Sequence, residues 1–202
     1  MTLRVGVLAS GEGTNLQALL DRVQGRDGVE IVAVGSDRPQ ARALERAAAA
    51  GVPARGFEAE PDRRARDAAM AAWLGESGVE LVVLAGYMQL LSPGFLAAFP
   101  QRVINVHPAL LPAFAGIRAI EQSLEYGVKV FGVTVHFVDE GVDTGPIILQ
   151  RAVELPAATR PSEVREALRP LEYDLLCDAV RLIARDAVRI DPANPRRVIV
   201  AA

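Results

Sequence analysis

Short runs of continuously apolar residues recur along this chain and alternate with runs of helical spacing. The strand-like runs cover residues 3–9, 29–36, 79–86 and 102–107, with a short one at 52–57. A strand without polar alternation has to be buried on both faces, which is typical of a parallel sheet covered by helices. The alternation therefore predicts an α/β fold with a Rossmann-like, mostly parallel sheet and helices on both faces.

Helical spacing fills the segments between these runs. The predicted helices cover residues 15–25, 39–51 and 61–78. The last of them opens with Pro61 and Asp62, residue types that are common at helix starts. Helices of this length are the usual connections between neighbouring parallel strands.

The second half of the chain has a different pattern. Residues 128–140 and 145–155 form two strand-like runs with a short loop between them, which predicts an antiparallel C-terminal strand pair. A long helix at 161–185 follows, and we expect Pro170 to interrupt or kink it. The tail, at about 186–202, has the pattern of a small terminal hairpin.

Composition limits the classes of function. The chain has 202 residues, of which 50% are hydrophobic and 23% charged, so we expect one domain over residues 1–202. The net charge of −3 gives no sign of nucleic-acid binding. The lone cysteine, Cys177, excludes an intrachain disulfide and a multi-cysteine zinc cluster, and its apolar surroundings indicate an inert core residue.

No segment has the character of an export signal or a membrane span. Residues 1–10 lack the long apolar run of a signal peptide. No uninterrupted apolar segment reaches the ~20 residues that a bilayer-spanning helix needs. We therefore expect a cytoplasmic protein without a membrane partner.

The segment SGEGTN, residues 10–15, follows the first predicted strand and opens the first predicted helix. Gly11 and Gly13 allow a tight turn that exposes backbone amides, Thr14 adds a hydroxyl, and the helix start adds positive potential. This combination suits a single monoester phosphate. A dinucleotide fingerprint would require a third glycine where Leu16 stands. The alternative is an ordinary strand-to-helix turn.

Two polar side chains lie near the end of the predicted strand 102–107. Asn105 and His107 stand at positions i and i+2, so they project to the same side of the strand, and Pro108 favours the strand's end there. Buried amides and imidazoles cost free energy unless they are hydrogen-bonded. The two are therefore either a satisfied structural pair or part of a catalytic site. His136, the second histidine of the chain, is a core histidine or lines the same site.

Asp143 lies in a turn between Gly141 and Gly145. A carboxylate beside a histidine favours the protonated imidazole, which is the basis of acid–base pairing. The alternative is that Asp143 only shapes the turn. The histidines and this aspartate lack the spacing of metal ligands, so we expect no metal ion. The segment GYMQLLSP, residues 86–93, is either a hydrophobic ligand wall or a plain loop that packs on the core.

Four segments occur together in the order and spacing of a known family. They are SGEGTN at 10–15, VVLAGYMQLLSP at 82–93, NVHPALLPAF at 105–114 and TVHFVDEGVDTGPIILQ at 134–150. From residue 3 to about residue 175, the chain resembles the phosphoribosylglycinamide formyltransferases, also called glycinamide ribonucleotide transformylases. These are folate-dependent formyltransferases.

The resemblance implies a reaction. The formyl group of 10-formyltetrahydrofolate, a cosubstrate, would pass to the glycine amine of glycinamide ribonucleotide in de novo purine biosynthesis. Asn105 and a protonated His107 would donate hydrogen bonds to the formyl oxygen as it gains charge. Asp143 would keep His107 charged and oriented. No metal ion and no obligatory protein partner are implied.

The resemblance also assigns residues to the two substrates. Gly13, Thr14 and Asn15 would hold the ribonucleotide near its phosphate. Glu172 would contact the same substrate, although with Arg169 it also fits an ordinary helical ion pair. The residues implied in folate binding are Arg63, Met88, Gln89, Leu90, Leu91 and Asn105.

Two positions depart from the family's pattern. Members commonly carry Arg where Gln89 stands and His where Ile120 stands. If either side chain binds a ligand in those members, this chain makes the contact differently. Neither change removes Asn105, His107 or Asp143, so the implied activity stands.

Three other functions compete with this one. Methionyl-tRNA formyltransferase has an extra C-terminal domain and formyltetrahydrofolate hydrolase an N-terminal regulatory domain, and we expect neither within these 202 residues. A non-catalytic, Rossmann-like nucleotide-binding protein would carry the third glycine that is missing at Leu16. The sequence therefore favours the formyltransferase.

Overall fold

The computed structural model describes residues 2–58 and 62–201, which form two compact units that meet in the chain between Asn105 and Val106. The elements of the first unit are β1 (Leu3–Leu8), α1 (Thr14–Arg22), β2 (Val29–Ser36), α2 (Arg42–Ala49), β3 (Ala54–Gly56), α3 (Arg63–Glu76), β4 (Leu81–Leu84) and α4 (Pro93–Ala98). Strand β5 (Val103–His107) carries the chain from one unit into the other. The second unit contains α5 (Ala119–Tyr126), β6 (Val130–Phe137), β7 (Ile147–Glu154), α6 (Pro161–Ala184), β8 (Val188–Asp191) and β9 (Asn194–Val200).

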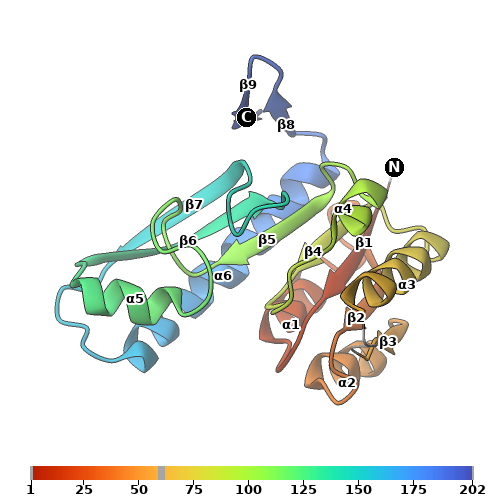
Figure 1. Cartoon of the computed structure of the whole chain (residues 1–202), viewed down its shortest axis with the longest axis horizontal. Helices are drawn as coiled ribbons and strands as arrows, with labels where there is room; N and C mark the ends of the chain where they lie inside the picture. Colours follow the sequence, from red (N-terminus) through yellow and green to blue (C-terminus); the bar gives the residue numbers. More distant parts are fainter. Residues whose placement is uncertain (1, 59–61, 202) are drawn as a thin grey trace. The chain divides into compact units, whose positions relative to one another are not determined.

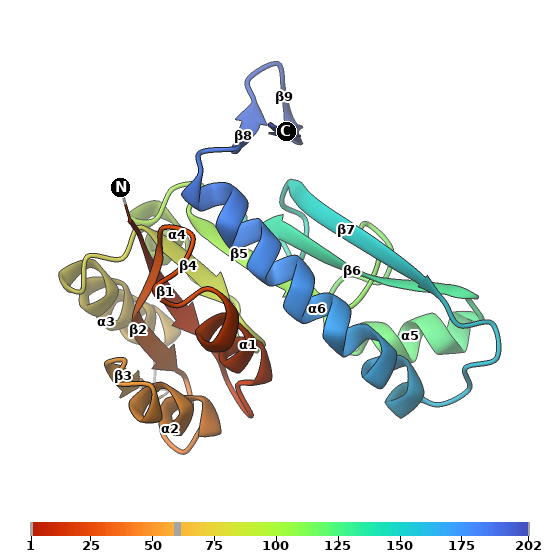
Figure 2. The same cartoon turned by 180° about the vertical axis from the view of Figure 1, so that it is seen from behind.

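The first unit is a parallel sheet with helices on both faces. Its strand order is β3-β2-β1-β4-β5, and every neighbouring pair is parallel. Helices α1 and α2 contact each other on one face, and α3 and α4 contact each other on the opposite face (Figures 1 and 2). Strand β4 is buried over its whole length, as its continuously apolar sequence requires. The predicted α/β class is confirmed.

The second unit is built on an antiparallel strand pair. Strands β6 and β7 pair antiparallel from Val130 with Glu154 to His136 with Ile147, which confirms the predicted C-terminal pair. Helix α6 packs on both strands, and α5 contacts α6 (Figure 2). Strand β9 pairs with β7 in parallel at Ile147 and Arg197, and with β8 antiparallel.

Helix α6 runs as a single element from Pro161 to Ala184, so an interruption at Pro170 is wrong. Pro170 cannot donate a hydrogen bond to the carbonyl of Glu166. Both residues are exposed, so water can bond that carbonyl in place of the missing N–H. On the opposite face Leu168 and Leu175 are buried, which keeps the helix against the strands. Cys177 is also buried, which confirms it as a core residue.

Two short helices were not predicted. Helix α4 begins where the side-chain hydroxyl of Ser92 accepts a hydrogen bond from the Phe95 N–H at 3.3 Å, with Pro93 as the first helical residue. Helix α5 has no side-chain cap: Arg118 precedes it with a left-handed backbone, φ 61°, and Gly127 ends it.

Helix α3 shows how the predicted helix boundaries shift. Pro61, the predicted first residue, lies outside the described residues. Asp62 caps the helix because its carboxylate accepts from the Arg64 N–H at 2.9 Å. Within the described ranges, no helix is both long enough and apolar enough to cross a membrane.

A buried carboxylate, Asp67, joins α3 to the residue that precedes α4. The guanidinium of Arg66 donates to the Asp67 carboxylate at 3.1 and 2.8 Å, and both side chains are almost fully buried. The other oxygen of Asp67 accepts the Ser92 N–H at 2.7 Å. The carboxylate is thus satisfied by a charge and by a backbone donor, which is what a buried carboxylate requires.

The first prediction concerns this pair. Asp67→Ala leaves the Arg66 guanidinium buried without its counter-charge, so it should lower the free energy of unfolding by about 3–5 kcal/mol. Asp62→Ala, on the same helix, is the control and should cost only about 1 kcal/mol, because it removes a solvent-exposed cap. Urea denaturation of both variants measures the difference. Equal losses would contradict the assignment of Asp67 as the main anchor.

Candidate active site

The loop between β1 and α1 has a backbone that only glycine fits at one position. Gly13 precedes α1 with φ 69°, in the left-handed region that favours glycine. A Cβ atom there would lie 2.8 Å from the Cα and the Cβ of Ala43. Gly13 has no side chain with which to cap the helix, so the N-terminus of α1 begins directly at the loop.

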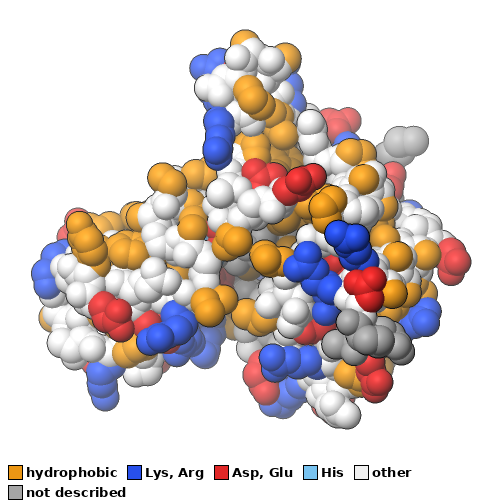
Figure 3. Space-filling model, in the orientation of Figure 1, with side chains coloured by type: hydrophobic (Ala, Val, Ile, Leu, Met, Phe, Trp, Pro, Cys, Tyr) orange, Lys and Arg blue, Asp and Glu red, His pale blue; other side chains and the backbone are white. Residues whose placement is uncertain are grey.

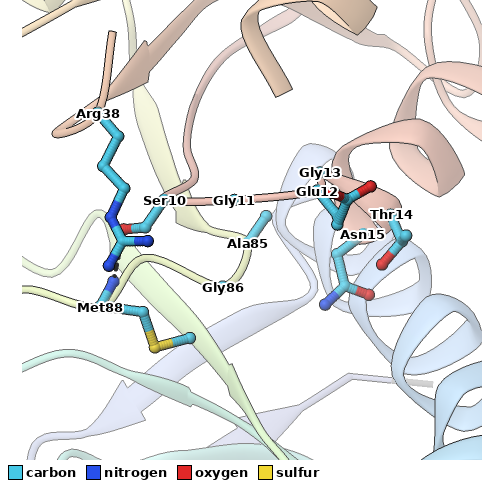
Figure 4. A pocket seen from close by; sticks show the side chains of 10 residues that line it. All are labelled: Ser10, Gly11, Glu12, Gly13, Thr14, Asn15, Arg38, Ala85, Gly86 and Met88. Carbon is cyan, nitrogen blue, oxygen red and sulfur yellow. Dashed lines mark hydrogen bonds between the residues drawn. The ribbon is translucent and has the colours of Figure 1, made fainter. Parts of the chain in front are cut away.

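A cavity of about 260 Å³ opens beside this loop (Figure 4). Its remaining walls come from Arg38 and from the turn after β4. The residues that line it are Ser10, Gly11, Glu12, Gly13, Thr14, Asn15, Arg38, Ala85, Gly86 and Met88. The three predicted phosphate-binding residues, Gly13, Thr14 and Asn15, therefore lie together on one cavity wall.

The charges of the cavity suit an anion. The carboxylate of Glu12 is paired with Arg42 at 3.2 Å, which offsets its negative charge. Arg38 extends into the cavity near Ser10 and Met88 (Figure 4). Backbone N–H groups at the start of α1 and a guanidinium are the groups that bind phosphate in proteins.

The predicted folate segment, residues 88–91, is anchored at both ends and open between them. The Met88 N–H donates to the hydroxyl oxygen of Ser10 at 2.8 Å, and Ser92 at the other end donates to Asp67. Met88 and Leu90 are 63% and 53% exposed, whereas Leu91 is buried. Apolar side chains stand among charged ones on the face shown in Figure 3. Two exposed apolar side chains on a fastened backbone form a surface that suits a flat apolar ligand.

The other predicted binding residues lie on two helices and in the segment 88–91. Arg63 is the exposed first residue of α3, and Gln89 is also exposed. Glu172 is half-buried in the middle of α6, in the second unit, and Arg169 is exposed. Ile120 is buried in α5, so it acts as a core residue there.

Strand β5 carries the two polar residues that the sequence singled out. Asn105 is half-buried and His107 is 5% exposed. The Nδ1 atom of His107 lies 3.2 Å from a carboxylate oxygen of Asp143, and its Nε2 atom lies 2.9 Å from the carbonyl oxygen of Phe114. A neutral imidazole has one N–H and can donate to only one of these acceptors, whereas the protonated ring donates to both.

The Asp143 carboxylate stands at the centre of this cluster. Its Oδ2 atom accepts the Gly116 N–H at 2.8 Å, and its Oδ1 atom lies 3.4 Å from Nε2 of His136. Burial alone would raise the pKa of Asp143, but the bonds from His136 and Gly116, together with the charges of both imidazoles, lower it to about 2. The carboxylate is therefore ionised at neutral pH.

The turn that presents Asp143 is tightly closed. Asp143 has φ 52°, in the left-handed region that aspartate tolerates better than most residues. A Cβ atom on Gly145 would lie 1.8 Å from the carbonyl oxygen of Phe137, so the chain passes too close for any other residue. Asp143 therefore shapes the turn, as one of the two sequence interpretations holds, and its carboxylate also lies beside His107.

His136 was not among the predicted site residues. It is 1% exposed, and its Nδ1 atom lies 2.7 Å from the carbonyl oxygen of Phe137. Its Nε2 atom faces Asp143, so it is at once a core histidine and a neighbour of the carboxylate. The sequence feature that could have indicated this contact is the position of His136 on the predicted strand that leads into the Asp143 turn.

The second prediction follows from the lowered pKa of Asp143. A depressed carboxyl pKa stabilises the fold above the unfolded value of about 4, and this stabilisation is lost as the pH falls towards 2. Wild type should lose about 1–2 kcal/mol from this group between pH 4 and pH 2, since partial exposure screens the full effect. Asp143→Asn should have a lower free energy of unfolding at pH 6 than wild type. Between pH 4 and pH 2 its free energy of unfolding should fall less steeply. The same slope in both proteins, from denaturation at each pH, would show that Asp143 does not titrate there.

Comparison with known proteins gives consistent results. Residues 3–180 match the family described as formyl transferase. A phosphoribosylglycinamide formyltransferase of Mycobacterium tuberculosis is 43% identical over 189 residues, which are 93% of this chain and 87% of that protein. One of Bacillus subtilis is 40% identical and covers 84% of this chain and 89% of its own. The crystal structure of glycinamide ribonucleotide transformylase 1 from Symbiobacterium toebii superposes with a TM-score of 0.94 at 48% identity, over 100% of this chain and 95% of that one.

Proposed function

Because the chain belongs to the formyl transferase family, we propose that it transfers the formyl group of 10-formyltetrahydrofolate to the glycine amine of glycinamide ribonucleotide. The product is formylglycinamide ribonucleotide, in de novo purine biosynthesis. The names and the similarity of the relatives support this reaction. The observation that carries it is the contact between His107 and the ionised Asp143, because formyl transfer needs a held donor that can also give a proton.

The proposed chemistry uses the donors of β5. The substrate amine attacks the formyl carbon, and the formyl oxygen gains negative charge. The side-chain amide of Asn105 and the Nε2–H of His107 donate to that oxygen, which lowers the barrier. The formyl oxygen then takes the hydrogen bond that the Phe114 carbonyl accepts in the free protein. When the bond to folate breaks, the amine has lost one proton and the folate nitrogen has gained one.

Asp143 and His136 support His107. The carboxylate accepts from Nδ1 of His107 and favours its protonated form, so that Nε2 keeps a hydrogen to donate. The contact of His136 and the N–H of Gly116 hold the carboxylate in place. In this proposal Asn105 and His107 contact the reacting atoms, and Asp143 acts on them through His107.

The two substrates bind to different segments in this proposal. Gly13, Thr14 and Asn15 hold the phosphate of the ribonucleotide, and the position of these residues at the N-terminus of α1, on the cavity wall, supports this. Glu172 contacts the same substrate. The folate lies against residues 88–91, which are exposed and anchored at both ends. Arg63 and Asn105 complete the proposed folate contacts.

The proposal includes the setting of the reaction. The substrates are two small molecules, with folate as a cosubstrate and with no metal ion or obligatory protein partner. We place the enzyme in the cytoplasm, in agreement with the sequence expectation. We also treat residues 1–202 as one formyltransferase domain. The family match over residues 3–180 supports its main part, and β8 and β9 pair as a terminal hairpin beyond that match.

An assay with three acceptor conditions tests the function. Formation of the deformylated folate should be rapid with glycinamide ribonucleotide and negligible with water alone or without an acceptor. Rapid turnover with water would indicate a folate hydrolase. Folate binding without turnover under any condition would indicate a non-catalytic protein.

The third prediction concerns His107. His107→Ala should lower kcat by about 100-fold or more, the usual scale for loss of an oxyanion donor or a general acid. Calorimetry should find ribonucleotide binding nearly unchanged, because the proposed phosphate site does not include His107. Turnover near the wild-type rate in a folded variant would rule out the role.

The fourth prediction concerns the departure at Gln89. Its side chain is exposed, so Gln89→Ala should change kcat/KM for the folate by no more than a factor corresponding to about 1 kcal/mol. Steady-state kinetics with the folate as the varied substrate measure the change. A loss of several hundredfold would show that Gln89 has a specific role in place of the family's arginine.

A further inference from the structure

Ser10 joins two segments that are distant in the sequence. Its N–H donates to the carbonyl oxygen of Gly86 at 3.1 Å, and its hydroxyl oxygen accepts from the Met88 N–H at 2.8 Å (Figure 4). The residue is 1% exposed, so water does not compete for these bonds. One buried serine therefore sets the position of the backbone at 86–88.

The two joined segments form walls of the same cavity. Ser10 is followed directly by the loop 11–15, and Met88 is the first residue of segment 88–91. Both the loop and residues 85, 86 and 88 line the cavity. In the proposed function, the loop holds the ribonucleotide phosphate and the segment holds the folate.

We propose that Ser10 is a positioning residue that couples the two substrate sites, so that each substrate binds more tightly when the other is bound; this inference rests on the proposed function. A ligand that orders one segment also restrains the other segment through the Ser10 hydroxyl. The second ligand then binds at a smaller cost in conformational entropy. Such coupling is reciprocal by thermodynamic necessity. It favours the complex with both substrates over either complex with one.

The far end of the folate segment lacks this connection. Ser92 donates its N–H to Asp67 on α3, and its hydroxyl caps α4 by accepting from Phe95. These bonds fix the segment to helices and not to the phosphate loop. The coupling is therefore assigned to the Ser10 end alone, and Ser92 serves as a comparison.

Ser10→Ala tests the hydroxyl while leaving the backbone bond to Gly86 in place. Calorimetry measures the Kd of glycinamide ribonucleotide alone and with saturating tetrahydrofolate, the deformylated product. In wild type, tetrahydrofolate should tighten ribonucleotide binding about fivefold or more, the usual lower range for coupled sites. In Ser10→Ala the factor should fall below about twofold.

Two serine-to-alanine variants serve as matched controls. Ser36→Ala removes an equally buried hydroxyl that accepts the Arg38 N–H at 3.0 Å, outside the folate segment, and should keep the wild-type coupling factor. Ser92→Ala should weaken tetrahydrofolate binding without reducing the coupling factor. Thermal unfolding of each variant checks that all remain folded at the assay temperature.

The outcomes separate the coupling from the function itself. The inference is overturned if Ser10→Ala keeps the wild-type coupling factor, or if wild type shows no coupling. In either case the proposed function stands as long as wild type binds each ligand alone. An equal reduction in Ser36→Ala also overturns it, because any buried hydroxyl would then suffice. If wild type binds neither ligand alone, the proposed function fails and the coupling fails with it.

Discussion

The candidate active site is organised around one carboxylate that is shared between two imidazoles. Asp143 presents one oxygen to His107 and the other to His136, and the Gly116 N–H bonds the first of these oxygens as well. Each ring has a second nitrogen beside a backbone carbonyl, so every nitrogen of both rings faces an oxygen acceptor. The surrounding turns and strands thus hold four acceptor oxygens around two imidazole rings.

Much of the fold could be predicted because its signals are local. Continuously apolar strands between helical runs specify a covered parallel sheet, and β4, buried at every residue, is the clearest case. The prediction was weaker where a few residues decide the outcome. Helix α4 depends on the Ser92 cap and on Pro93. Helix α5 follows Arg118, whose left-handed backbone cannot be predicted from a sequence pattern. At Pro170 a local rule was overridden, because buried residues on the opposite face of α6 keep the helix intact.

The candidate site was predictable where polar residues break an apolar pattern, as Asn105 and His107 do on β5. The contact of His107 with Asp143 was anticipated from the glycine-flanked turn, although only the fold shows that it is made at 3.2 Å. The contact of His136 was left open because a histidine within an apolar strand looks like any core histidine. The anchors Ser10 and Asp67 were missed for another reason: they act through backbone N–H groups far away in the sequence, and such bonds leave no pattern.

The Phe114 carbonyl in front of His107 has a thermodynamic consequence for every ligand of this site. A ligand that accepts a hydrogen bond from Nε2 of His107 replaces the bond to the Phe114 carbonyl. Its gain in binding free energy is therefore only the difference between the two hydrogen bonds. Phe114 holds this position with φ 56°, a backbone conformation that costs a bulky residue about 1 kcal/mol or more. An acceptor that carries more negative charge than a carbonyl forms the stronger bond to this N–H, so in the proposed reaction the exchange favours the formyl oxygen as it becomes an anion.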